Sequence, residues 1–185
     1  EIRLSGPAVD LHSGVFGGAV VNPAMALAQI LAQMKDKSGR VKIPGFYDDV
    51  RPLSDEERAE WQKLPFSEKK YRKELGAPKL FGESGYTTLE RVWGRPTFEV
   101  NGLLAGFTGE GAKTVIPAVS MAKVSMRLVP DQHPDKIAEL FLAYVDKVAP
   151  KGVEVKVTRM HGGKPWITGF ENPYVRAAGR AIEQG

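Results

Sequence analysis

Apolar residues recur at helical spacing in two segments, and each segment begins with a helix-start signal. From Asn22 to Lys35 the spacing is i, i+3, i+4, i+7, and Asn22-Pro23 supplies a capping side chain and a favourable first residue. A second helix is predicted from Pro134 through Val148. The first stripe is Leu27, Ile30, Leu31 and Met34, and the second is Ile137, Leu140, Phe141, Tyr144 and Val148.

Strict alternation of apolar and polar residues predicts strands. The clearest is Val119–Leu128, where Ala122 and its alternate neighbours face one side, while Arg127 lies among the polar residues of the other. A glycine-rich loop is expected over Gly102–Gly111. The other predicted strands are short: Glu1–Leu4, Thr97–Asn101, and Val153–Met160, which fades at Gly162-Gly163.

The predicted order is strand, helix, strand, strand, helix, strand, which is the split β-α-β arrangement. We therefore expect an α+β fold: a ferredoxin-like two-layer sandwich with an antiparallel four-stranded sheet and two helices on one face. The polar sheet face that carries Arg127 is left free.

A charged helical insertion is expected between the first helix and the second strand, at about residues 40–85. Its densest part, 40–79, has ten basic and eight acidic residues by count of the sequence. Ser54-Asp55-Glu56-Glu57 is a capping-box pattern for a short helix, and Ser67 opens another that ends near Gly76. The balanced charge argues against a nucleic-acid-binding arm.

Composition narrows the class of protein. The chain has 185 residues, 42% hydrophobic and 26% charged, with a net charge of +4 and no cysteine. The absence of cysteine excludes disulfides, thiolate zinc sites and cysteine nucleophiles within these residues, and favours a cytoplasmic location. No apolar run approaches the roughly 18 residues of a membrane span, and no signal peptide is visible at the first residue.

Two segments resemble catalytic motifs, but the spacing of their residues does not fit. Gly106–Thr114 imitates a phosphate-binding P-loop, but Ala112 separates the last glycine from the lysine. Asp10, His12 and Ser13 have the residue types of a serine triad, yet they are too close in sequence to adopt its geometry.

Metal and RNA sites are also disfavoured by pattern. The three histidines, His12, His133 and His161, are far apart and none has H-E-x-x-H spacing. RNA-recognition modules stack bases on strand aromatics, and Val119–Leu128 and Val153–Met160 contain none. His12 in its glycine-rich loop and Arg127 on the sheet remain candidates for chemistry. The alternatives are a surface or turn histidine, and an arginine that is ion-paired or solvated.

Four motifs in order, and the insertion, resemble a known family. Together they are similar to the carnosinase-like branch of the zinc aminoacylase/desuccinylase peptidase superfamily. The motifs are DLHSGVFGG at 10–18, GEGAKTVIP at 109–117, SMRLVP at 125–130 and HGGKPW at 161–166, with IPGFY at 43–47 in the insertion.

The resemblance implies that this chain is only part of such an enzyme. Residues 1–167 match the lid or dimerisation domain, and 168–185 match the start of the return into a catalytic domain. In the family that catalytic domain holds two zinc ions, so no metal ligand and no independent activity are expected here. The partners expected are a second copy of the chain and a dipeptide-like substrate, with no nucleic acid and no membrane.

The resemblance also implies roles for four residues. His12 matches a catalytic histidine that reaches the partner's active site and stabilises the oxyanion formed when zinc-bound hydroxide attacks the peptide. Thr114 matches a substrate-binding residue contributed in the same way. Arg127 matches the residue that binds the substrate's terminal carboxylate, and His161 a residue near the substrate. The alternative is a ferredoxin-like module that only dimerises and has no part in catalysis.

Overall fold

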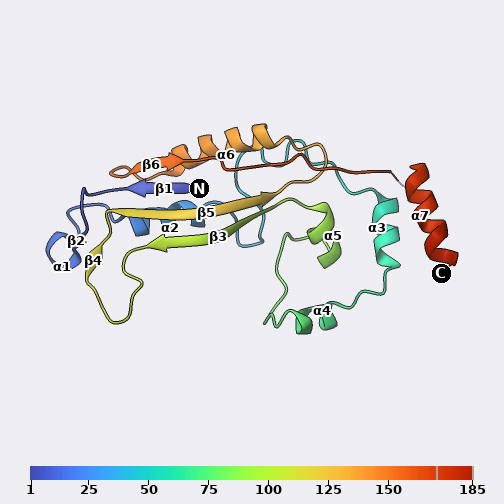
Figure 1. Cartoon of the computed structure of the whole chain (residues 1–185), viewed down its shortest axis with the longest axis horizontal. Helices are drawn as coiled ribbons and strands as arrows, with labels where there is room; N and C mark the ends of the chain where they lie inside the picture. Colours follow the sequence, from blue (N-terminus) through green and yellow to red (C-terminus); the bar gives the residue numbers. More distant parts are fainter. Residues whose placement is uncertain (170, 185) are drawn as a thin grey trace.

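The computed structural model describes residues 1–169 and 171–184. Its centre is a four-stranded antiparallel sheet in which Ile2 pairs with Ala122 on one side and Val157 on the other. Figure 1 shows the four strands side by side. Their order is β3 (Thr97–Ala105), β5 (Val119–Arg127), β1 (Ile2–Ser5), β6 (Glu154–Val157). This order confirms the predicted ferredoxin-like sheet.

The two predicted helices share one core with the sheet. They are α2 (Pro23–Ala32) and α6 (Pro134–Val148). The Asn22 side chain accepts a hydrogen bond from Ala24 N at 2.9 Å, as expected of a helix cap. The core joins both apolar stripes to the alternate strand residues, and Val145, which the stripe omitted, is 1% exposed.

Two strand ends differ from prediction. β3 continues through the predicted glycine loop to Ala105, because a bulge between Val100 and Gly102 shifts the register without ending the pairing with β5. The loop therefore begins only at Gly106. β6 ends at Val157, so the following segment through Met160 is irregular.

A small second sheet lies at one end of the domain, at the left of Figure 1. It consists of β2 (Leu11–His12) and β4 (Val115–Ile116), and the short helix α1 (Ser13–Phe16) follows β2. Neither strand was predicted, because two residues are too few for an alternation signal.

The helices of the insertion lie at the opposite end of Figure 1, whereas its first residues, Val41, Ile43 and Phe46, are buried in the main core. The insertion contains α3 (Asp55–Gln62) and α4 (Glu68–Glu74), and α5 (Thr88–Gly94) follows it. Ser54 and Glu57 form the predicted capping box, while α5 was not predicted although Thr87 and Glu90 form a second one. The boundary near residue 85 and the division at residue 167 stay predictions.

The last helix is α7 (Pro173–Gln184), and Asn172 Oδ1 accepts from Tyr174 N at its start. It lies beyond the insertion at the far end of Figure 1. No helix in the described part of the chain has the length and apolar character needed to cross a membrane.

Candidate functional site

The small sheet brings His12 and Thr114 together although 102 positions separate them. His12 pairs with Val115 across β2 and β4, and Ser13 N donates to Thr114 O at 3.0 Å. The side chains meet as well, with 2.9 Å between His12 Nε2 and Thr114 Oγ1. Both residues are exposed, so this pair is presented to the surroundings from the end of the domain.

Backbone contacts select one tautomer of His12. Gly14 N donates to His12 Nδ1 at 3.1 Å, so Nδ1 is an acceptor and Nε2 carries the proton in the neutral ring. The Nε2–H group therefore donates to Thr114 Oγ1. An exposed N–H donor that can turn from a neighbouring hydroxyl to a substrate oxygen has the chemistry needed to stabilise a developing negative charge.

The serine-triad pattern does not form. Asp10 Oδ1 accepts a hydrogen bond from Ala118 N at 2.8 Å, just before β5 begins. The Asp10 carboxylate therefore binds backbone and not the His12 ring. Ser13 follows β2 directly and opens α1, but both ring nitrogens of His12 bind other groups, Gly14 N and Thr114 Oγ1, so the histidine does not serve as a base for Ser13. The P-loop imitation also fails, because the short strand β4 follows it where a phosphate-binding helix would begin.

Arg127 lies at the other end of β5, in register with Thr97 at the start of β3. Its side chain is exposed on the polar sheet face, as the alternation predicted. No salt bridge joins it to another residue of the described ranges, so of the two alternatives, an ion-paired and a solvated arginine, only the solvated one fits the structure. A guanidinium on an open sheet face is well suited to bind a carboxylate in a bidentate manner.

His161 lies toward the same end of the domain as Arg127. β6 runs in the direction of β5, with β1 between them, and the chain continues past the start of β1. Gly162 lies next to Pro134 at the start of α6, and Arg159 there pairs with Asp135 at 2.5 Å. His161 itself is exposed.

The four candidates thus form two groups. His12 and Thr114 lie beyond the first residue of β5, and Arg127 is its last. A strand of nine residues rising about 3.3 Å each separates the groups by about 26 Å. A dipeptide spans only about 7 Å, so one dipeptide cannot contact both groups within one chain.

No group of three or more potential metal ligands (His, Cys, Asp or Glu) lies together in the ranges that the structure describes. His12, His133 and His161 each stand without such a group. The residues of these ranges therefore do not fit a zinc ion.

This leads to a prediction about metal content. We expect the dialysed 185-residue chain to bind no stoichiometric zinc, because a tight site needs three or four convergent ligands. Elemental analysis would measure the zinc-to-protein ratio. One or more tightly held ions per chain would contradict the expectation.

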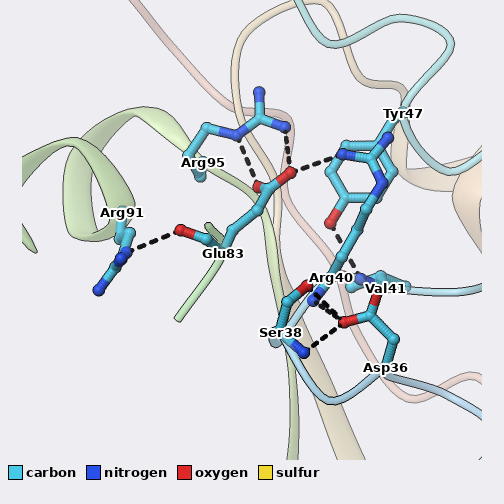
Figure 2. Close-up of polar contacts among 8 residues, drawn as sticks. All are labelled: Asp36, Ser38, Arg40, Val41, Tyr47, Glu83, Arg91 and Arg95. Atoms are coloured by element: carbon cyan, nitrogen blue, oxygen red, sulfur yellow. Dashed lines mark hydrogen bonds and ion pairs between the residues drawn. The ribbon is translucent and has the colours of Figure 1, made fainter. Parts of the chain in front are cut away.

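Pattern reasoning missed the most buried charged cluster of the chain, shown in Figure 2. Glu83 binds Arg95 through two hydrogen bonds of 2.8 and 3.0 Å and Arg40 through one of 2.6 Å. The sequence separations are 12 and 43 residues, which match no helix or strand period. No sequence signal could have found this cluster.

The sequence matches a protein-family model. The profile described as the peptidase dimerisation domain, M20_dimer, matches residues 1–153. The chain belongs to this family. The resemblance found in the motifs is confirmed.

The relatives of this dimerisation domain are peptidases, and the chain matches one part of each. It is 33% identical over 186 residues to the Cys-Gly metallodipeptidase DUG1 of Candida albicans, covering 99% of this chain and 38% of the relative. It is 31% identical to the human Beta-Ala-His dipeptidase, covering 94% of this chain and 35% of the relative. The chain therefore spans well under half of the curated relatives it matches.

Solved structures agree with this assignment. The dipeptidase Dug1p from Saccharomyces cerevisiae superposes with a TM-score of 0.85 at 30% identity, over 99% of this chain and 39% of that one. An M20 family metallo-carboxypeptidase from Sulfolobus solfataricus gives 0.83 at 33% identity, over 99% and 47%. The predicted fold and the dimerisation-domain class are thus both confirmed.

Proposed function

We propose that this dimerisation domain serves as the lid of a metallodipeptidase that hydrolyses short peptides with a free C-terminal carboxylate. The relatives named as dipeptidases support the reaction class. The exposed guanidinium of Arg127, with no ion-pair partner in the described ranges, supports the requirement for a carboxylate.

The observation that carries the proposal is the separation of the two residue groups along β5. Because one chain cannot bring both to one dipeptide, each active site takes Arg127 and His161 from one subunit and His12 and Thr114 from the other. A two-fold dimer satisfies this requirement twice, since both subunits exchange the same groups.

In this proposal His12 is the catalytic residue of the domain. Its Nε2–H, which donates to Thr114 Oγ1 in the structure, turns from that oxygen to the one that gains negative charge when water adds to the peptide carbonyl. The Thr114 hydroxyl is then released to bind substrate. Arg127 binds the terminal carboxylate in a bidentate manner, and His161 lies beside the substrate. The proton that His12 presents is fixed on Nε2 by the Gly14 hydrogen bond.

The relative from Candida albicans is named a metallodipeptidase. We further propose that the metal ions of the complete peptidase are bound by residues outside this chain. The domain alone is then inactive. The cytoplasmic location and the absence of nucleic-acid and membrane partners are part of the same proposal.

The β3 edge of the sheet is the dimer surface we propose. β3 is an outer strand of nine residues, whereas β6 at the other edge has four. Leu103 and Leu104 on β3 are 63% and 56% exposed. An exposed edge strand with apolar side chains has unpaired backbone groups that can pair with the same strand of a second copy.

A substitution at this edge tests the dimer. Leu103→Glu in the complete peptidase places a charge at the proposed interface, and we expect light scattering to show mainly monomer at micromolar concentration. The matched control is Lys156→Glu, on the exposed face of β6, which should remain dimeric. A dimer with Leu103→Glu and a monomer with Lys156→Glu would place the interface on the other edge.

A further inference from the structure

The buried charged cluster lies next to the strand that pairs with Arg127. The side chains of Glu83 and Arg95 are 9% and 7% exposed, an unusual burial for two opposite charges. Every buried side-chain nitrogen and oxygen in the described residues has a hydrogen-bond partner. The carboxylate therefore has a fixed position, set by its donors and not by solvent.

Three separate segments meet at Glu83 (Figure 2). Arg40 comes from the loop after α2, Glu83 from the insertion, and Arg95 from the link between α5 and β3. Arg91 Nε also donates to the Glu83 backbone oxygen at 2.9 Å. One carboxylate thus joins the beginning and the end of the insertion to the residue that leads into β3.

Aromatic rings hold the two arginines from the other side. The Arg40 guanidinium lies 3.9 Å from the centre of the Tyr47 ring, and that of Arg95 lies 4.4 Å from the Tyr86 ring. Burial raises the pKa of Tyr47, which keeps this ring neutral. Burial alone would lower the pKa of Arg95, but the hydrogen bonds and charge of Glu83 outweigh it and raise that pKa.

The cluster is only two residues from the register partner of Arg127. Arg95 precedes buried Pro96, and Thr97 then pairs with Arg127 across β3 and β5. Phe98 is 2% exposed in the core. The start of β3 is therefore fixed by the packing of Phe98 and by the hydrogen bonds between Glu83 and Arg95. A shift of Arg95 would move the start of β3, and with it the backbone of Thr97 that pairs with Arg127.

We propose that Glu83 is a positioning residue that, through Arg95 and the start of β3, holds Arg127 in place to bind the substrate carboxylate. This inference rests on the proposed function of Arg127. Glu83 itself does not touch substrate. Its role is to place the β5 end correctly, because a misplacement of about 1 Å in a binding group is enough to cost much of its effect.

The test compares a free dipeptide with its C-terminal amide in the complete peptidase. Glu83→Gln keeps the shape but loses the charge that binds two guanidinium groups. We expect KM for the free dipeptide to rise about tenfold, with little change for the amide and in kcat. Arg95→Lys, which keeps the charge but loses the bidentate geometry, should show the same pattern.

A double variant separates positioning from stability. In an Arg127→Ala background, Glu83→Gln should cause no further rise in KM, because its effect passes through Arg127. The matched control is Glu57→Gln, since Glu57 also binds an arginine, Arg51, through two hydrogen bonds but lies in α3. This control should leave KM unchanged. If Glu83→Gln does not fold, Arg40→Gln, at the more exposed arginine, replaces it.

The outcomes are distinct. If Arg127→Ala affects the free dipeptide and its amide equally, the carboxylate role of Arg127 is wrong, and this inference falls with it. If Arg127→Ala discriminates between the two substrates but Glu83→Gln does not, only the inference about Glu83 is wrong. Equal losses from Glu83→Gln with and without Arg127 would make Glu83 purely structural.

Discussion

Replacing His12 with alanine in the complete peptidase is expected to lower turnover about 10²–10³-fold, the usual effect of losing one donor to an oxyanion, about 3–4 kcal/mol. The reason is that alanine removes the Nε2–H donor, whose tautomer is set by the Gly14 N–H bond to Nδ1. Steady-state kinetics would measure kcat, and metal content, folding and dimerisation should stay unchanged.

Asp10→Asn is the matched control for His12. Its side-chain oxygen can still accept from Ala118 N, so the loop should keep its shape and kcat should stay within about twofold. A loss as large as that of His12→Ala would revive a triad-like role for Asp10. An unchanged kcat in His12→Ala would favour the alternative, in which the domain only dimerises and takes no part in catalysis.

Arg127→Lys is expected to raise KM for free dipeptides by about 10- to 100-fold, because lysine keeps the charge but loses the bidentate hydrogen bonds. C-terminally amidated dipeptides should be affected far less, since they offer no carboxylate. Michaelis constants for paired free and amidated substrates measure the difference.

Lys123→Ala is the control for Arg127, because Lys123 lies on the same polar face of β5 and is also exposed. It should change neither substrate's KM. Equal losses on free and amidated dipeptides with Arg127→Lys would mean that Arg127 supports the structure and does not bind the carboxylate.

The elements that bury a continuous stripe could be predicted from the sequence. The α2 and α6 stripes and the β5 alternation repeat over several turns or residues, and together they fix the layer arrangement. The pairing of β3 beyond Gly102 could not be predicted, since a bulge allows a glycine inside a strand. Helix α5 was missed although its Thr87–Glu90 capping box was readable.

The candidate site shows the same limit. The position of Arg127 on the polar face followed from alternation, because neighbours in a strand alternate by necessity. The meeting of His12 and Thr114 depends on a two-residue strand pair, and the Glu83 cluster on contacts across 43 positions. Such contacts depend on the tertiary fold and leave no local period in the sequence.

The central claim is that one active site takes His12 from one subunit and Arg127 from the other. The direct test mixes two full-length variants, His12→Ala and Arg127→Ala, each nearly inactive alone at low substrate concentration. If the residues act from different subunits, one site of each mixed dimer has both. Random re-pairing makes half the dimers mixed, so about a quarter of wild-type activity should return. If mixed dimers are shown to form and no activity returns, both residues come from the same subunit and the account is wrong.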